Sequence, residues 1–310
     1  MEEIPDPVPK ADEVLIRIEA AALNYPDVLI VANQYQISIP PPFIPGSEFA
    51  GVVAAVGSDV TEFQPGDRVN STTFVGAFAQ YACLPARAVK RIPDGVTSAE
   101  AAAFGVVYAT AYHAIRSVAE VESGDWVVVL GAAGGVGLAC VELAKLRGGR
   151  VLAAASSPEK LEVCRASGAE AVIDYETEDL KERIKEITGG GADVVLDPVG
   201  GPYAEQALRA TRWGGRFVTL GFASGEIPRI PLNLVLLKGV IVKGFEIRTF
   251  GEHAPAEQKR DDEELDALFN SGELRPHVSA TYSLDQVREA LGALAERRAV
   301  GKVVIDPWME

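Results

Sequence analysis

The fold of this chain is decided by the stretch Trp126-Val-Val-Val-Leu-Gly-Ala-Ala-Gly-Gly-Val-Gly-Leu-Ala-Cys140. Its apolar run, 126–130, is typical of a strand buried on both faces. Glycines follow at once and lead into a helical pattern of apolar residues. A strand, a glycine turn and a helix in this order can bring backbone N–H groups and the positive end of a helix dipole against a pyrophosphate. The stretch predicts a dinucleotide site at Gly134, Gly135 and Val136.

The glycine spacing departs from the usual G-x-G-x-x-G, because Ala132 stands at the first position. A plain connection between a strand and a helix is therefore the alternative for this segment alone. The chain downstream favours the nucleotide site, since further strands are predicted to alternate with helices of about ten residues. The strands are expected at 150–155, 171–175, 192–197, 216–221 and 240–245, and the helices at 158–166, 179–188 and 203–211. This order predicts an α/β fold with a doubly wound parallel sheet.

The choice of cofactor is indicated at the end of the second strand, where NAD-binding folds usually place an acid for the ribose 2′-hydroxyl. This chain has Ser156 and Ser157 there, with Lys160 one turn into the next helix. Hydroxyls and an ammonium accept a 2′-phosphate that an acid would repel. The sequence thus favours NADPH over NADH. The alternative is that the serines only cap the helix and Lys160 is solvated.

Several motifs, at 44–53, 64–69, 132–137, 197–201, 221–225 and 297–304, resemble the quinone oxidoreductase (zeta-crystallin-like) branch of the medium-chain dehydrogenase/reductases. The resemblance runs almost from end to end. It implies a Rossmann dinucleotide-binding domain at 108–245, inserted into a GroES-like β-rich substrate domain formed by 1–107 and 246–310. It also implies a homodimer, because the terminal strand within 229–245 pairs with its mate in such relatives.

Composition restricts the partners and the compartment. The 310 residues are 48% hydrophobic and 24% charged, with a formal net charge of −15. That charge argues against nucleic acid and anionic membrane surfaces as partners. Polar residues interrupt the longest apolar stretches, so we expect no membrane span. The first residues lack a basic region followed by an apolar run, which makes the cytoplasm the expected location.

Metal chemistry is not expected. The three cysteines, Cys83, Cys140 and Cys164, are far apart and form no C-x-x-C pair. The catalytic ligands of zinc-dependent relatives correspond to positions within residues 24–27, 46–48 and 104–107 of this chain. At these positions, Glu48 is the one possible zinc ligand left. A zinc-independent reaction is predicted.

Three further expectations concern single segments. The opening Glu-Glu-Ile-Pro-Asp-Pro-Val-Pro follows a pair of strands in such relatives, so either the true start lies upstream or one sheet edge is open. His113 is interpreted as a packed core residue rather than a proton donor. The polar run 252–264 is interpreted as a solvated loop and helix start.

The resemblance also assigns site residues. Asn24, Tyr25 and Tyr35 stand at positions that face the nicotinamide and the substrate in the family. Without a metal, a phenol of Tyr35 or Tyr25 could stabilise the developing oxyanion or supply a proton, with Asn24 as an orienting donor. The alternative is that the tyrosines only shape an aromatic slot. The cofactor-binding residues implied are Thr110, Gly134, Gly135, Val136, Ser156, Lys160, Tyr175, Phe222, Ser224, Phe250, Arg298 and Lys302; Asp197 is expected to be structural.

These residues predict a zinc-independent, NADPH-dependent reductase whose substrate is a quinone or a similar electron-poor carbonyl or enone. The enzymatic alternative is reduction of an enoyl thioester or alkenal. A thioester on coenzyme A or a carrier arm should need a basic patch at the entrance of the site. The first domain has no Lys/Arg cluster, which mildly disfavours this alternative. The alternative from another class is an NADPH-binding structural or regulatory protein with little turnover, since a fold does not establish chemistry.

Overall fold

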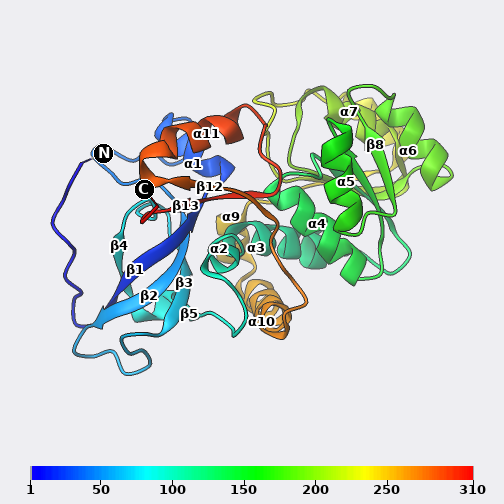
Figure 1. Cartoon of the computed structure of the whole chain (residues 1–310). Helices are drawn as coiled ribbons and strands as arrows, with labels where there is room; N and C mark the ends of the chain where they lie inside the picture. Colours follow the sequence, from blue (N-terminus) through cyan, green and yellow to red (C-terminus); the bar gives the residue numbers. More distant parts are fainter. Residues whose placement is uncertain (1, 310) are drawn as a thin grey trace. The chain divides into compact units, whose positions relative to one another are not determined.

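The computed structural model describes residues 2–309, which form two compact units (Figure 1). The central unit is Val107–Leu268, and the outer unit comprises the described residues on either side of it. The chain therefore returns to the outer unit at Phe269, later than the expected residue 246. The reason is that α9 (Ile247–His253) and most of α10 (Pro255–Ser271) pack within the central unit.

The central unit is built on a six-stranded parallel sheet in the order β11-β10-β9-β6-β7-β8. This is the doubly wound order in which the chain reverses direction between its first and fourth strands, here β6 and β9. The strands are β6 (Trp126–Leu130), β7 (Arg150–Ala155), β8 (Ala171–Asp174), β9 (Ala192–Asp197), β10 (Thr211–Thr219) and β11 (Ile241–Gly244). The predicted α/β fold is confirmed.

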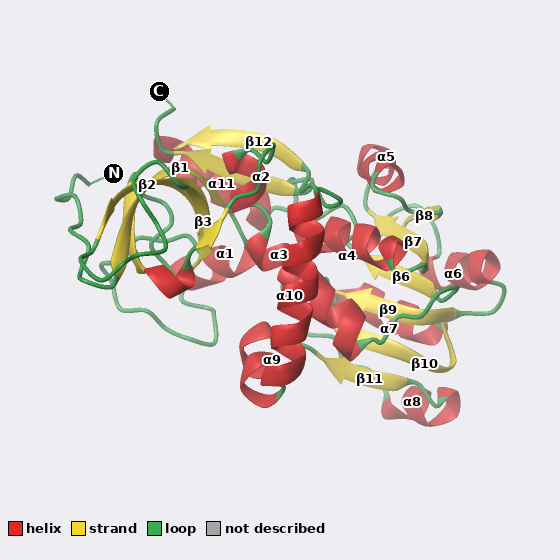
Figure 2. Ribbon diagram, turned by 90° about the horizontal axis from the view of Figure 1, so that it is seen from below, coloured by secondary structure: helices red, strands yellow, loops and turns green. Residues whose placement is uncertain are grey.

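Helices cover the central sheet, as Figure 2 shows. The helices that connect the strands are α4 (Gly135–Leu146), α5 (Pro158–Ala166), α6 (Leu180–Thr188), α7 (Gly201–Arg209) and α8 (Leu232–Lys238). Before the sheet, α3 (Gly105–His113) continues into a π-helical turn, Ala114–Val118. Two of these helices begin at a side-chain cap: Ser157 accepts a hydrogen bond from Lys160 N–H at the start of α5, and Asp179 accepts one from Glu182 N–H at the start of α6.

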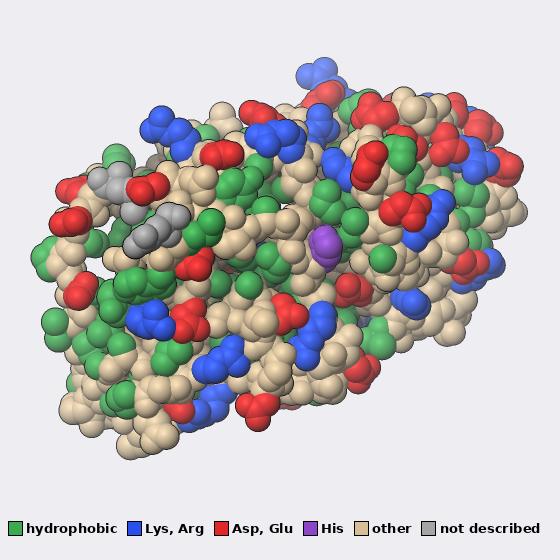
Figure 3. All heavy atoms as spheres, viewed as in Figure 1, with side chains coloured by type: hydrophobic (Ala, Val, Ile, Leu, Met, Phe, Trp, Pro, Cys, Tyr) green, Lys and Arg blue, Asp and Glu red, His purple; other side chains and the backbone are tan. Residues whose placement is uncertain are grey.

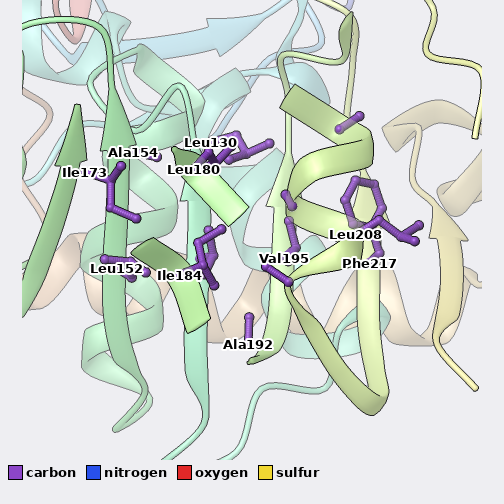
Figure 4. Close-up of a cluster of buried hydrophobic side chains, with 14 of the residues drawn as sticks. Leu130, Leu152, Ala154, Ile173, Leu180, Ile184, Ala192, Val195, Leu208 and Phe217 are labelled. Atoms are coloured by element: carbon purple, nitrogen blue, oxygen red, sulfur yellow. The ribbon is translucent and has the colours of Figure 1, made fainter. Parts of the chain in front are cut away.

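The core of the central unit explains why β6, β7 and β9 read as continuous apolar runs. Leu130, Leu152 and Val195 are fully buried, because helices cover both faces of the sheet. In Figure 4, Leu180 and Ile184 from α6 point onto these strands from successive turns of one helix. Each such side chain contributes about 1.5–3 kcal/mol of burial free energy.

The outer unit is a mixed sheet in the order β12-β13-β1-β2-β3-β5, with β4 also paired to β1. Val14, Ile16 and Ile18 alternate inward from β1 and are completely buried. The elements are β1 (Glu13–Ala22), α1 (Tyr25–Val31), β2 (Glu48–Val56), β3 (Arg68–Thr72), β4 (Tyr81–Pro85), β5 (Lys90–Arg91), α2 (Ser98–Ala102), β12 (Val278–Ser283), α11 (Val287–Ala295) and β13 (Lys302–Asp306), with 3₁₀ turns at Ala86–Ala88 and Leu284–Gln286. This is the predicted GroES-like β-rich domain.

Two expectations on helices were incomplete. The run 252–264 is not a solvated loop, because it lies within α9 and α10, and Asp261 is fully buried. The segment 229–245 contains α8 before its strand. Within residues 2–309, no helix has both the length and the apolar character needed to cross a membrane.

Candidate functional site

The glycine turn lies where β6 ends, at the reversal point of the central sheet. Gly131 has a φ of 57°, and a Cβ there would come within 2.6 Å of Val199 Cγ2. A Cβ on Gly137 would overlap with the carbonyl of Gly131, so both positions require glycine. Gly134 is the N-cap of α4, and Gly135 and Val136 open its first turn. The turn therefore presents the N-terminus of a twelve-residue helix at the carboxyl edge of the sheet.

The next two strands place the predicted adenosine residues at the same edge. Ala155 pairs with Asp174, so Ser156 and Tyr175 leave β7 and β8 side by side. Tyr175 N–H donates to Ala155 O at 3.1 Å. Lys160 Nζ lies 3.0 Å from Ser156 Oγ. A hydroxyl, an ammonium and a tyrosine are thus brought together by three separate elements.

These features fit a dinucleotide on two independent grounds. The first is steric, because the lack of room for a Cβ at Gly131 and Gly137 keeps the turn tight, which lets backbone N–H groups approach a pyrophosphate. The second is chemical, because Lys160 and Ser156 form a donor pair suited to a phosphate. On the face seen in Figure 3, carboxylates gather over the part of the central unit that contains α5 and α6.

A second loop packs against the end of β9. Gly200 and Gly201 both have positive φ, and a Cβ on them would lie 2.8 Å from Phe222 Cδ1 and 2.8 Å from Ser224 Oγ respectively. Phe222 and Ser224 therefore lie beside the β9 turn. Asp197 is fully buried, and its Oδ1 accepts the N–H groups of residues 199 and 200 at 2.9 and 2.8 Å. Burial raises the pKa of Asp197. These contacts agree with the expected structural role of Asp197.

Phe250 lies on α9, in a group of aromatic rings around His113. The His113 ring centroid is 5.1 Å from that of Phe250 and 6.1 Å from that of Phe245. A cavity of about 240 Å³ adjoins the phenylalanines and is lined by Val118, Gly244, Phe245, Glu246, Thr249, Phe250 and His253. Thr110 is half-buried on α3, one turn before His113.

His113 has more polar contacts than the expected packed core residue. It is 1% exposed, and its Nδ1 lies 3.1 Å from Asp261 Oδ2. Its Nε2 lies 3.3 Å from Asp262 Oδ1, close enough for an ion pair although without hydrogen-bond geometry. Ser117 Oγ also donates to Asp261, at 2.6 Å. Burial alone would lower the pKa of His113, but the carboxylates of Asp262 and Asp261 outweigh it and raise the pKa.

In the outer unit, Lys302 is at the centre of a buried polar cluster. Its ammonium lies 2.7 Å from the Leu23 carbonyl, 2.6 Å from Asn24 Oδ1 and 2.7 Å from Glu48 Oε1. Lys302 is 3% exposed and Glu48 1%. All three ammonium hydrogens have acceptors inside the unit. The contact with cofactor phosphates expected for Lys302 is therefore wrong, because burial commits its charge to Glu48.

Asn24 is held by the same cluster. Its amide nitrogen donates to Ser47 Oγ at 3.2 Å and to Glu48 Oε1 at 2.9 Å, so both amide hydrogens are used. Its backbone N–H donates to Asp27 Oδ2 at 2.7 Å. Burial raises the pKa of Asp27 to about 6. These bonds fix the start of α1.

The two tyrosines lie at either end of α1. Tyr25 is its first residue and is half-buried. Tyr35 is half-buried in the following loop, and its ring centroid is 6.0 Å from that of Phe74. Arg298 is largely exposed and pairs with Glu296 at 2.7 Å. No cluster of three or more His, Cys, Asp or Glu side chains suited to a metal occurs between residues 2 and 309.

Comparison with known protein families agrees with both units. Residues 10–94 match the alcohol dehydrogenase GroES-like domain, and residues 135–260 match the zinc-binding dehydrogenase family. The quinone oxidoreductase-like protein 2 homolog of Nematostella vectensis is 37% identical over 297 residues, which cover 95% of this chain and 81% of that protein. The chain belongs to the quinone oxidoreductase branch of the medium-chain dehydrogenase/reductases. It is an oxidoreductase.

Solved structures share this fold. Escherichia coli quinone oxidoreductase, complexed with NADPH, superposes with a TM-score of 0.87 at 29% identity and covers 99% of this chain and 95% of its own. The CurK enoyl reductase superposes with a TM-score of 0.85 at 28% identity, over 98% and 94% of the two chains. Both reaction types are thus represented among the structural relatives.

Three features of the site were not predicted. The positive φ of Gly131 was not predicted, because the glycine motif is defined by the spacing of later glycines and not by the residue that ends the strand. Tyr203, which contacts the Tyr175 ring, had no local signal because α7 brings it from a distant segment. The role of Asp261 could have been suspected, because it stands four residues before Leu265 and eight before Phe269, which are buried on the inward face of α10.

Proposed function

We propose that this oxidoreductase uses NADPH to reduce quinones or closely related electron-poor carbonyl and enone compounds, without a metal. The observation that carries the cofactor choice is the pair Lys160 and Ser156, whose side-chain atoms lie 3.0 Å apart beside Tyr175. An ammonium and a hydroxyl suit the 2′-phosphate that distinguishes NADPH from NADH.

Further residues of the central unit would hold the remainder of the cofactor. The N-terminus of α4, with Gly134, Gly135 and Val136, would bind the pyrophosphate through backbone N–H groups and the helix dipole. Thr110, Phe222, Ser224 and Phe250 are proposed to lie around the nicotinamide half. The nicotinamide, when bound, supplies the hydride.

The outer unit would supply the acid and polar groups. A phenol of Tyr35 or Tyr25 is proposed to donate a hydrogen bond to the substrate oxygen, where negative charge develops, and to pass it a proton. Asn24 is better suited to positioning Tyr25 than to contacting substrate, because both of its amide hydrogens are engaged by Ser47 and Glu48.

Independence from zinc is supported by the way Glu48 is used. A Glu carboxylate is a possible zinc ligand, but here Lys302 neutralises it at 2.7 Å. Val106 N–H donates to the other oxygen of Glu48 at 2.9 Å. We expect exhaustive chelation to leave turnover unchanged.

Self-association is proposed through β11, an edge strand of the central sheet (Figure 2). Ile241 and Val242 on it are 49% and 47% exposed. Apolar side chains on β10 and α8 are still more exposed, namely Trp213, Leu232, Leu236 and Leu237. An exposed apolar edge favours pairing with a second copy of the chain. We therefore propose that the protein is a homodimer, and we propose the cytoplasm as its location.

The deciding experiment follows NADPH oxidation by its nicotinamide absorbance with quinones, enones and enoyl thioesters, and with NADH in parallel. The expected result is fast turnover of quinones with a preference for NADPH, and loss of that turnover in Tyr35→Phe or in Tyr25→Phe. Faster turnover of enoyl thioesters would favour the enoyl reductase reaction, which the CurK likeness supports. NADPH binding with no turnover would favour a structural or regulatory protein. Equal use of NADH would overturn the cofactor assignment.

A further inference from the structure

The segment that carries Tyr175 is acidic. Asp174, Glu176, Glu178 and Asp179 fall within six consecutive residues that also include Tyr175. Ala155 pairs with Asp174, so this segment leaves β8 beside Ser156. Any of its carboxylates that is free to turn towards Lys160 would compete with a 2′-phosphate for the Lys160 charge, because an ammonium pairs with either anion. The NADPH preference proposed above thus requires that these acids be held elsewhere.

Three of the four acids are engaged by their own neighbourhood. Asp174 Oδ1 accepts Glu176 N–H at 3.1 Å. Glu178 accepts Asp174 N–H at 2.9 Å and pairs with Arg183 at 2.7 Å. Asp179 caps α6 by accepting Glu182 N–H at 2.9 Å. Local turn and helix contacts thus restrain these carboxylates.

Glu176 is held from a different element. Its Oε1 accepts a hydrogen bond from the Tyr203 hydroxyl on α7 at 2.8 Å. The same tyrosine places its ring 4.3 Å from the Tyr175 ring, at 38° between the planes. Both tyrosines are half-buried and pack against the core of the central unit. Tyr203 therefore contacts both Tyr175, which lies beside Ser156, and the acid that follows it.

We propose that Tyr203 is a specificity-determining positioning residue that favours the 2′-phosphate by supporting the Tyr175 ring and holding the Glu176 carboxylate on the side of α7. This inference rests on the proposed use of NADPH and adds a residue outside the phosphate-binding set. When the hydroxyl is removed, Glu176 can turn towards Lys160 and compete with the phosphate.

The test uses the full chain and two fragments, 2′,5′-ADP and AMP, titrated calorimetrically so that turnover is not needed. Tyr203→Phe keeps the ring and removes the hydroxyl. We expect it to weaken 2′,5′-ADP binding about two- to fivefold, the strength of one exposed ion pair, and to leave AMP binding unchanged. The loss should shrink in high salt, which screens exposed charges.

The second variant is the rescue. In Tyr203→Phe/Glu176→Gln the competing charge is gone, so 2′,5′-ADP binding should return to the wild-type value. Tyr282→Phe, a half-buried tyrosine of the outer unit, is the matched control and should change neither ligand. Equal weakening of both ligands, an unchanged Tyr203→Phe variant, or failure of the rescue would each overturn the role of Tyr203. A wild-type protein that binds both fragments equally would instead refute the NADPH proposal itself, and this inference with it.

Discussion

The ammonium of Lys302 lies 2.7 Å from the carboxylate of Glu48, and their side chains are 4% and 1% exposed. Two segments separated by most of the chain meet in this pair. Leu23 N–H donates to Val303 O at 2.9 Å, and Ala22 pairs with Val304, so β13 lies directly against the end of β1. The charge of Lys302 is therefore part of the fold of the outer unit.

The first prediction separates the charge of this pair from its volume. Lys302→Met leaves Glu48 buried without its cation and should lower the free energy of unfolding by about 3–5 kcal/mol. Lys302→Met/Glu48→Gln removes both charges and should recover most of that loss. Urea denaturation measures both variants, and Lys90→Met, on an exposed position of β5, is the control. A single variant as stable as the wild type would show that the pair contributes little.

Much of the central unit could be predicted from local sequence. Strands β6, β7 and β9 have the predicted bounds, because a sheet covered on both faces needs uninterrupted apolar runs. The predicted α5 is also correct in its bounds, since Ser157 and Pro158 mark its start. In these segments the local signal and the tertiary environment favour the same structure.

Prediction failed where a charge acquires its role from a distant partner. Lys302 follows Gly301 in a motif that suggested phosphate binding, yet strand pairing buries it against Glu48. Asp261 lies in a polar run that looks solvated, but α10 brings it to His113 on α3. Helical spacing can place a residue such as Asp261 on the inward face of a helix, but neither composition nor spacing identifies its partner on a distant segment.

The second prediction concerns the pH dependence of stability at His113. Its pKa is raised above the ordinary value in the folded protein, so protonated His113 stabilises the fold in full below the unfolded pKa, and this contribution is lost as the pH rises through the folded pKa. His113→Phe should therefore destabilise the protein by about 2–4 kcal/mol near pH 6 and by less near pH 9.

Urea denaturation at the two pH values tests this, with His277→Asn, an exposed histidine, as the control. The same loss of stability at both pH values would mean that His113 acts only through packing against Phe245 and Phe250.

The third prediction distinguishes two glycines of the same turn. A Cβ on Gly137 would overlap with the backbone at Gly131, so Gly137→Ala should lower both the melting temperature and NADPH affinity. A Cβ on Gly134 would lie 3.4 Å from the Gly131 oxygen, and the φ of −79° suits alanine. Gly134→Ala should thus keep the stability and weaken NADPH binding alone, because its methyl group would point into the pyrophosphate space.

Thermal unfolding and calorimetric titration with NADPH provide the two readouts. The assignment of the pyrophosphate to this turn would be refuted by a stable Gly134→Ala variant that binds NADPH as tightly as the wild type.

The last prediction concerns the exposed edge of the central sheet. Val242 is 47% exposed at the middle of β11, and the apolar surface nearby includes Leu236, which is 81% exposed. In a two-fold symmetric pairing of β11 with itself, a carboxylate at Val242 would meet its own copy in a partly dehydrated interface. Val242→Glu should therefore convert a dimer into a monomer, whereas Val8→Glu, at an 84% exposed position of the outer unit, should not. Sedimentation velocity at micromolar concentration distinguishes the two states. A monomeric wild-type protein, or a Val242→Glu variant that still sediments as a dimer, would exclude this edge as the interface, and the exposed apolar side chains would then need a different partner.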